Sequence, residues 1–336
     1  MSEPMQVRLP RDLGAPPAVA THRRPFAKLD RTDITSIAAL LGLLLLPVFG
    51  GGYWTYTLGL CFANAIAIIS VSFMVRYAGE VSIGHGVFVA VGAYTVAMIE
   101  RYFGLSLIVS LPVAALASGL LGAAFAYLSR PLAGITLAVA TMALALALPE
   151  ILLYFARFTG GFEGLYVKLD ALPGIAKPVQ RYYVPLIGLA VVVLLLRQFR
   201  HSGQAMSLLL NRTSATAAES FGVQRGWARV CSFTLSAGLA GVAGALLSFC
   251  ASTVSPNSFT LWTSIFLLVG SVVSLHALSL IGAVIGGIFL TLVPLQLAGA
   301  GDWVPVLYGA ALLIVVLVAN TLPQWLKAHR NRGAGR

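Results

Sequence analysis

Six residues between two long apolar runs have the types and spacing of a polar passage through a membrane: Gly79, Glu80, Ser82, Gly84, His85 and Gly86. The glycines let the backbone take unusual dihedral angles and approach a ligand closely. Short, glycine-interrupted segments with polar side chains line solute pathways in transporters. We therefore predict that this segment lines a pathway, and the alternative is an ordinary turn in which Glu80 and His85 are solvated.

A second polar stretch, Arg197–Arg229, interrupts the apolar runs after mid-chain. It holds five arginines and one acid, Glu219, and it is far longer than a tight turn between helices requires. Within it, Ala205–Phe221 has a helix-forming composition, and Gly222 stands where a helix-ending glycine is expected. We predict a helix that forms a surface for another protein. A solvated loop whose arginines only fix the topology is the alternative.

The remaining reactive residue types do not form a catalytic pattern. The five histidines are scattered without ligand spacing, so no metal site is predicted, and the three cysteines lie in apolar runs that favour packing over disulfides. The chain has no Gly-x-x-x-x-Gly-Lys-Ser/Thr loop, so it is not expected to hydrolyse ATP by that route. An intramembrane enzyme is therefore disfavoured.

The elements that must position these residues are membrane helices. The chain has 336 residues, of which 58% are hydrophobic and 10% charged, with a mean hydropathy of +0.89. These values predict an all-α polytopic membrane protein with about ten spans (8–10). The apolar runs place them at Ile34–Gly50, Tyr53–Val75, Ile83–Ile99, Leu105–Leu128, Leu132–Phe155, Tyr182–Leu196, Val230–Ala251, Phe259–Leu275, Leu278–Leu297 and Val304–Leu322.

The net charge of +11 is explained by topology, and no nucleic-acid partner is expected. With the N-terminus inside, the outer connections hold five basic residues (Arg101, Arg157, Lys168, Lys177 and Arg181), and all other Lys and Arg residues lie on the cytoplasmic side. The sequence thus predicts a basic cytoplasmic tail at 1–33, a transmembrane domain at 34–322 and a second basic cytoplasmic tail at 323–336. Loop 197–229 is then cytoplasmic, and loop 157–181 is on the outside.

Several motifs give the chain a family resemblance over about residues 55–322. They are YAGEVSIGHGVFVAVGAYT from Tyr77, TGGFEGL from Thr159, AAESFGV from Ala217, FTLSAGLAGVAGA from Phe233 and VSPNSF from Val254. In this order they resemble the permease subunits of branched-chain amino acid ABC importers, the LivM/LivH type. The long middle loop and the N-terminal extension are more similar to LivM.

The resemblance implies an assembly in the bacterial inner membrane. A second, LivH-like permease subunit, two cytoplasmic ATP-binding subunits and a periplasmic solute-binding protein are the expected partners besides membrane lipid. The chain itself then needs no cofactor and is not an enzyme, because the ATPase subunits use the ATP. The cargo would be branched-chain or related amino acids, or small amides such as urea. The alternative is a stand-alone ion-coupled transporter, for which Glu150, Glu80 and His85 are the candidate relay groups.

The resemblance also assigns roles to residues. The pathway would be lined by the segment from Gly79 to Gly86. Coupling to the ATPase would use Arg212, Ala217, Ala218, Glu219 and Gly222. Docking of the binding protein would use Thr159, Gly160, Gly161, Lys168 and Lys177.

The chain departs from the family pattern at three places. Thr213, Ser214 and Ala215 follow Arg212 where the family has acidic residues. The run from Ser271 to Leu280 lacks most of the family's glycines, and Glu80 stands where glutamine is more common.

Overall fold

The computed structural model describes residues 31–48, 52–132, 134–169, 171, 174–276 and 278–297, with isolated positions between 303 and 317. Within these residues, eight helices are long and apolar enough to cross a membrane, and they coincide with the second to ninth predicted spans. They are α2 (Gly52–Tyr77), α3 (Gly86–Phe103), α4 (Leu107–Leu128), α5 (Ile135–Tyr154), α7 (Lys177–Arg200), α10 (Arg225–Ala251), η3 with α11 (Pro256–Ser258 and Leu261–Val273) and α12 (Leu280–Leu297). The all-α polytopic fold is thereby confirmed.

The two terminal spans of the predicted set have different outcomes. The first corresponds to α1 (Arg31–Leu45) and the short η1 (Leu46–Val48). A helix of 15 residues is about 22 Å long, which is less than the hydrocarbon thickness of about 30 Å. The tenth predicted span, Val304–Leu322, lies largely outside the described residues, as do most of both predicted tails. The eight spans found within the described residues lie in the predicted range of 8–10, and those residues do not test the count of ten.

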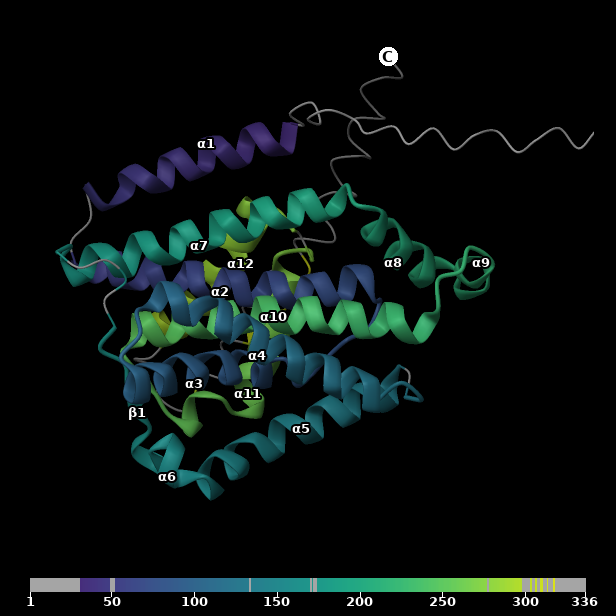
Figure 1. Ribbon diagram of the computed structural model, residues 1–336. Coiled ribbons are helices and arrows are strands. Elements are labelled where there is room, and N and C mark those ends of the chain that lie inside the picture. The colour runs from purple at the N-terminus through teal and green to yellow at the C-terminus, as the bar shows by residue number, and fades with distance from the viewer. Residues whose placement is uncertain are drawn as a thin grey trace, which may run out of the picture.

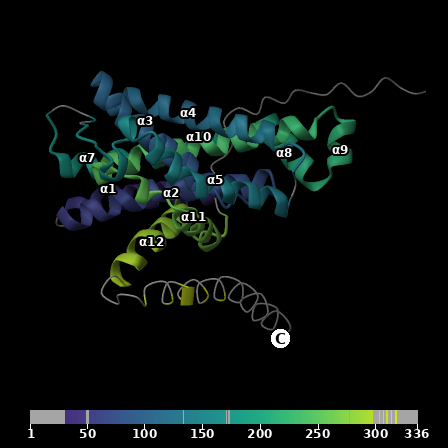
Figure 2. The same cartoon turned by 90° about the horizontal axis from the view of Figure 1, so that it is seen from below.

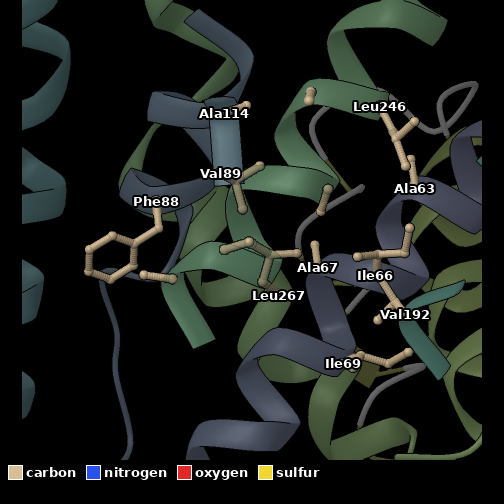
Figure 3. Packing of buried hydrophobic residues seen from close by; sticks show 14 of the residues in the cluster. Ala63, Ile66, Ala67, Ile69, Phe88, Val89, Ala114, Val192, Leu246 and Leu267 are labelled. Carbon is tan, nitrogen blue, oxygen red and sulfur yellow. The ribbon is translucent and has the colours of Figure 1, made fainter. Parts of the chain in front are cut away.

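Helix α2 forms the centre of the bundle. It packs against α7, α10, α11 and α12, and most of its side chains are buried. Figure 3 shows the core around it, with Ile66 and Ile69 from α2, Phe88 from α3 and Leu246 from α10. An almost wholly apolar helix of this kind is expected where protein surrounds the helix on all sides.

Glycine allows α10 to approach its neighbours closely. A Cβ placed on Gly244 would lie 1.9 Å from the carbonyl oxygen of Val89, and one placed on Gly92 would lie 2.1 Å from that of Gly241. In a membrane, helix association depends on such close packing because lipid is as apolar as the side chains. Helices α3 and α10 are therefore closely packed, and α10 also packs against α2.

The two ends of the bundle carry different short elements. One end holds α6 (Ala156–Thr159), η2 (Gly161–Glu163) and the antiparallel pair β1 (Leu165–Tyr166) and β2 (Thr253–Val254). The opposite end holds α8 (Gly203–Thr213) and α9 (Ala215–Ser220), which project beyond the spans in Figure 1. Figure 2 shows that α12 borders the bundle on the side away from α4.

The loop 197–229 folds differently from the prediction of one helix over Ala205–Phe221. Ser214 has extended backbone angles and ends α8, and its hydroxyl accepts a hydrogen bond from the Ala217 backbone N–H at 3.3 Å, which caps α9. Gly222 lies in the left-handed region with φ +80°, and the Val223 N–H donates to the Ala218 carbonyl. The predicted helix-ending glycine is confirmed, but the single helix is wrong because serine caps a second one.

The connection between α11 and α12 carries unusual backbone angles. Leu275 has φ +55° and His276 has φ +51°, in the run where the family usually has glycines. Left-handed angles cost a non-glycine residue about 1 kcal/mol or more because Cβ approaches the carbonyl oxygen. Neither residue is a glycine, so the turn is strained.

Replacing Leu275 with glycine is therefore expected to stabilise the protein by about 0.5–1 kcal/mol, because relief of about 1–2 kcal/mol of left-handed strain exceeds the entropy that glycine adds to the unfolded chain. The Leu275 side chain is exposed, so little packing is lost. Thermal unfolding in detergent measures the effect, and Leu275→Ala, which keeps the strained angle, is the matched control. Equal melting temperatures for the two variants would contradict the strain argument.

Candidate functional site

The segment between α2 and α3 is exposed at Gly79 and Val81, and from Ser82 on it is packed inside the protein. Ser82 and His85 are each 1% exposed, and Gly84 and Gly86 are also buried. This burial disagrees with an ordinary solvated turn. The segment is instead an internal element whose polar groups must be satisfied by the protein or by a ligand.

Hydrogen bonds fasten the segment to three helices. The Ile83 N–H donates to Thr141 Oγ1 of α5 at 3.1 Å, and the Gly86 N–H donates to Ser264 Oγ of α11 at 3.0 Å. His85 Nε2 and Ser236 Oγ of α10 are 3.3 Å apart. The segment therefore connects α5, α10 and α11 at one point. Sequence reasoning did not find these three hydroxyl partners, since each lies in an apolar run.

Two glycines make this packing possible. A Cβ on Gly84 would lie 2.0 Å from the Thr141 carbonyl oxygen, and a Cβ on Gly86 would lie 2.5 Å from Ser264 Oγ. Real Cβ atoms do not approach other atoms so closely. The two glycines thus approach protein closely, and the predicted approach to a passing solute stays a prediction.

Arg229 of α10 is the main contact of the segment at the α8–α9 end. Its guanidinium pairs with the Glu80 carboxylate and donates to the backbone carbonyls of Ser129 (3.3 Å), Arg130 (3.0 Å) and Leu132 in the α4–α5 connection. Arg229 is 7% exposed. Burial raises the pKa of the Glu80 carboxyl, and the charge of Arg229 offsets part of that rise. One buried cation thereby joins α10, the segment and the α4–α5 connection.

Arg212 at the end of α8 contacts the neighbouring residue of the segment. Its Nη1 donates to the Arg76 carbonyl at 2.5 Å, and its side chain lies against Gly79, where a Cβ would be 3.1 Å from Cγ. Gly79 has φ +70°, which favours glycine. Arg212 also lies near His276, whose pKa is lowered first by burial and then by this charge. Arg212, which precedes α9 in the chain, therefore lies against Gly79. Arg229, which follows α9, pairs with Glu80.

The other residues predicted for coupling lie on α9 and at its end. Ala218 is fully buried and Ala217 is half-buried, whereas Glu219 is exposed. The exposed surface around them includes Met206 and Phe221, which are 70% and 78% exposed. Helix α9 thus packs Ala218 against the chain and presents Glu219 outward.

The residues predicted for docking gather at the β1–β2 end. The Thr159 hydroxyl donates to the Leu152 carbonyl at 2.7 Å, and Gly160 and Gly161 have φ of +80° and +61°. These three residues build the turn that leaves α6. Lys168 and Lys177 line a cavity of about 180 Å³ together with Arg181. Of the residues predicted for docking, the first three therefore form a turn, and the two lysines line a basic cavity.

The described residues contain no group of three or more His, Cys, Asp or Glu side chains placed to hold a metal ion.

Comparison with known proteins agrees with the family resemblance of the motifs. Residues 36–319 match the family described as the branched-chain amino acid transport system permease component. The chain is 30% identical over 228 residues to the high-affinity branched-chain amino acid transport system permease protein LivM of Salmonella typhimurium, and 29% identical to the protein of the same name from Escherichia coli K12. Each alignment covers 60% of this chain and 53% of the relative, so it spans about half the length of those proteins. No solved structure matches the chain. The match over 36–319 confirms the predicted resemblance: the chain belongs to the branched-chain amino acid transport permease family.

Proposed function

We propose that this chain, with a second permease subunit, forms the translocation pathway of an ATP-driven importer for branched-chain or related amino acids. The observation that carries the proposal lies at the α8–α9 end. There the Arg212 side chain lies against Gly79, and Arg229 pairs with Glu80. A force applied to α8 reaches Gly79, at the start of the segment, through Arg212. The names of the LivM relatives support the substrate class.

The α8–α9 end is the cytoplasmic end in this proposal. Its exposed arginines fit the positive-inside rule, which also places both termini in the cytoplasm of a bacterial cell whose inner membrane the chain crosses. An ATPase subunit docks on the exposed face of α8 and α9, where Met206 and Phe221 supply apolar contact and Glu219 supplies charge. ATP is used there, and the chain needs no cofactor of its own.

The segment from Gly79 to Gly86 lines part of the route. Ser82 Oγ and His85 Nδ1 are buried and have no hydrogen-bond partner among the described residues. A buried polar atom without a partner costs free energy, so both atoms favour a state in which a polar solute or water reaches them.

The β1–β2 end receives the binding protein. The turn at Thr159, Gly160 and Gly161 shapes this surface, and Lys168 and Lys177 provide positive charge for acids on the partner. Such rim contacts act mainly on the association rate and weaken with salt.

The experiment that tests this function uses proteoliposomes holding the chain, its partner permease and two ATPase subunits. We expect uptake of radiolabelled leucine when ATP is inside and loaded binding protein is outside. Liposomes without the ATPase subunits, given a proton or sodium gradient, should not concentrate leucine. Accumulation on the gradient alone would establish the ion-coupled alternative.

A further inference from the structure

A cavity of about 280 Å³ lies among α2, α10, α11 and α12, beside the start of α3. Strand β2 borders it, so it extends toward the β1–β2 end of the bundle. It also borders Val89 and Thr263. Val89 lies one turn after Gly86, and Thr263 precedes Ser264, whose hydroxyl accepts the hydrogen bond from the Gly86 N–H. The cavity therefore lies between the end that receives the cargo in the proposed function and the Gly79–Gly86 segment.

The lining of this cavity combines apolar walls with uncharged polar groups. Leucines from four helices form much of the walls, namely Leu60, Leu247, Leu267 and Leu290. The polar side chains are Asn64, Ser248, Thr253, Ser258 and Thr263. Solute sites typically have such a mixture, and volumes of about 300–1,000 Å³ hold drug-sized ligands. The cavity is slightly smaller than that range and suits a small solute with an aliphatic part.

The larger groove between α4, α7 and α10 has a different lining. Its volume is about 820 Å³, and among the described residues that line it only Thr234 has a polar side chain. Lipid tails offer no hydrogen-bond partners, so an apolar lining suits them. The five polar side chains of the smaller cavity instead favour a polar solute or water.

Asn64 places an amide inside the membrane span. It lies about 18 Å along the axis of α2 from Gly52, in a hydrocarbon layer about 30 Å thick. Its Nδ2 donates to Thr291 Oγ1 of α12 at 3.0 Å. An amide oxygen can also accept hydrogen bonds, and no described residue donates one to Asn64 Oδ1. Because Asn64 lines the cavity, a donor on a solute can reach this oxygen.

We infer that the cavity is a subsite for the passing cargo, and that Asn64 Oδ1 accepts a hydrogen bond from an N–H group of that cargo. This inference rests on the proposed function, in which the cargo moves from the β1–β2 end toward the Gly79–Gly86 segment. Amino acids and small amides both carry an N–H donor, and the leucine walls accommodate an aliphatic side chain. The described lining residues carry no charge, so the cargo is held weakly and can leave.

Protection of an introduced thiol tests whether the cargo occupies the cavity. The complete transporter carries Thr263→Cys in a Cys231→Ser background that removes an exposed thiol. A small water-soluble thiosulfonate should react with the new thiol, and it should react more slowly when ATP and leucine-loaded binding protein are present than with ATP and unloaded binding protein. Trp262→Cys is the matched control. Trp262 is the exposed neighbour of Thr263 and does not line the cavity, so its rate should not depend on leucine.

The role of Asn64 is tested by removing its amide. Asn64→Leu should reduce ATP-driven leucine uptake about tenfold, as expected when one hydrogen bond to an ammonium group is lost. It should also abolish the protection of the thiol at position 263. Thr291→Val is the matched control, because it breaks the same hydrogen bond between α2 and α12 but keeps the Asn64 amide. Uptake and protection should both stay near the wild-type values.

Three results would overturn the inference. The first is a thiol at position 263 that does not react or is not protected by leucine, which would mean that the cargo does not occupy the cavity. The second is unchanged uptake by Asn64→Leu. The third is an equal loss in Asn64→Leu and Thr291→Val, which would assign Asn64 to helix packing alone. Failure of the wild-type complex to take up leucine with ATP would instead contradict the proposed function, and the inference would fall with it.

Discussion

Replacing Arg229 with alanine is expected to destabilise the protein by about 3–5 kcal/mol and to abolish transport. The substitution leaves the buried Glu80 carboxylate without its cation and removes the donor to three carbonyls of the α4–α5 connection. Breaking a buried ion pair on one side typically costs this much because the other charge stays buried. Chemical unfolding in mixed micelles measures the loss.

The matched control is Arg225→Ala, which removes an exposed arginine one turn earlier on α10 whose charge acts on Glu80 without an ion pair, and it should change stability by less than about 0.5 kcal/mol. A double variant, Glu80→Ala with Arg229→Ala, should cost less than the sum of the two single changes, because neither charge is then left alone. Additive costs would show that the two side chains act independently and would contradict the ion pair between Glu80 and Arg229.

Replacing Gly84 with alanine is expected to have the second largest effect. The new methyl group would lie 2.0 Å from the Thr141 carbonyl oxygen, so α5 or the segment must shift. Overpacking of this kind costs about 1–3 kcal/mol, and here it also breaks the hydrogen bond from Ile83 to Thr141. We expect ATP-dependent leucine uptake to fall at least tenfold.

Gly42→Ala is the matched control for that substitution. Gly42 lies on α1, and no atom lies within 4 Å of the position that its Cβ would take. Uptake and melting temperature should stay near the wild-type values. A Gly84→Ala protein that behaves like Gly42→Ala would mean that α5 does not pack on the segment in the working transporter.

The membrane spans could be predicted from the sequence because the information is local. Runs of apolar residues separated by polar breaks are sufficient to place a helix in a bilayer, and the second to ninth spans appear in the predicted order. The break within loop 197–229 was missed because Ser214 is compatible with a helix interior. Only the observed cap to the Ala217 N–H shows that it begins a new helix.

The contacts of Arg229 could not be predicted, because they join residues that are far apart in the sequence. Arg229 is a topology-fixing arginine in the sequence, and the carbonyls that it contacts are 97–100 residues away along the chain. Hydrophobic periodicity indicates local secondary structure and does not indicate contacts between residues so far apart. The glycine pattern predicted an approach to a solute at Gly84, which stays a prediction, and the approach to the backbone of α5 could be recognised only in three dimensions.

The central claim is that movement of α8 and α9 reaches the buried segment through Arg212. The most direct test is the amount of leucine imported per ATP hydrolysed by the complete transporter carrying Arg212→Ala, compared with wild type. Thr213→Ala is the control, because the Thr213 hydroxyl bonds only to carbonyls of its own helix. We predict that Arg212→Ala keeps hydrolysis stimulated by loaded binding protein but loses at least tenfold in leucine per ATP, while Thr213→Ala retains both. An Arg212→Ala transporter with an unchanged ratio of leucine to ATP would contradict the claim.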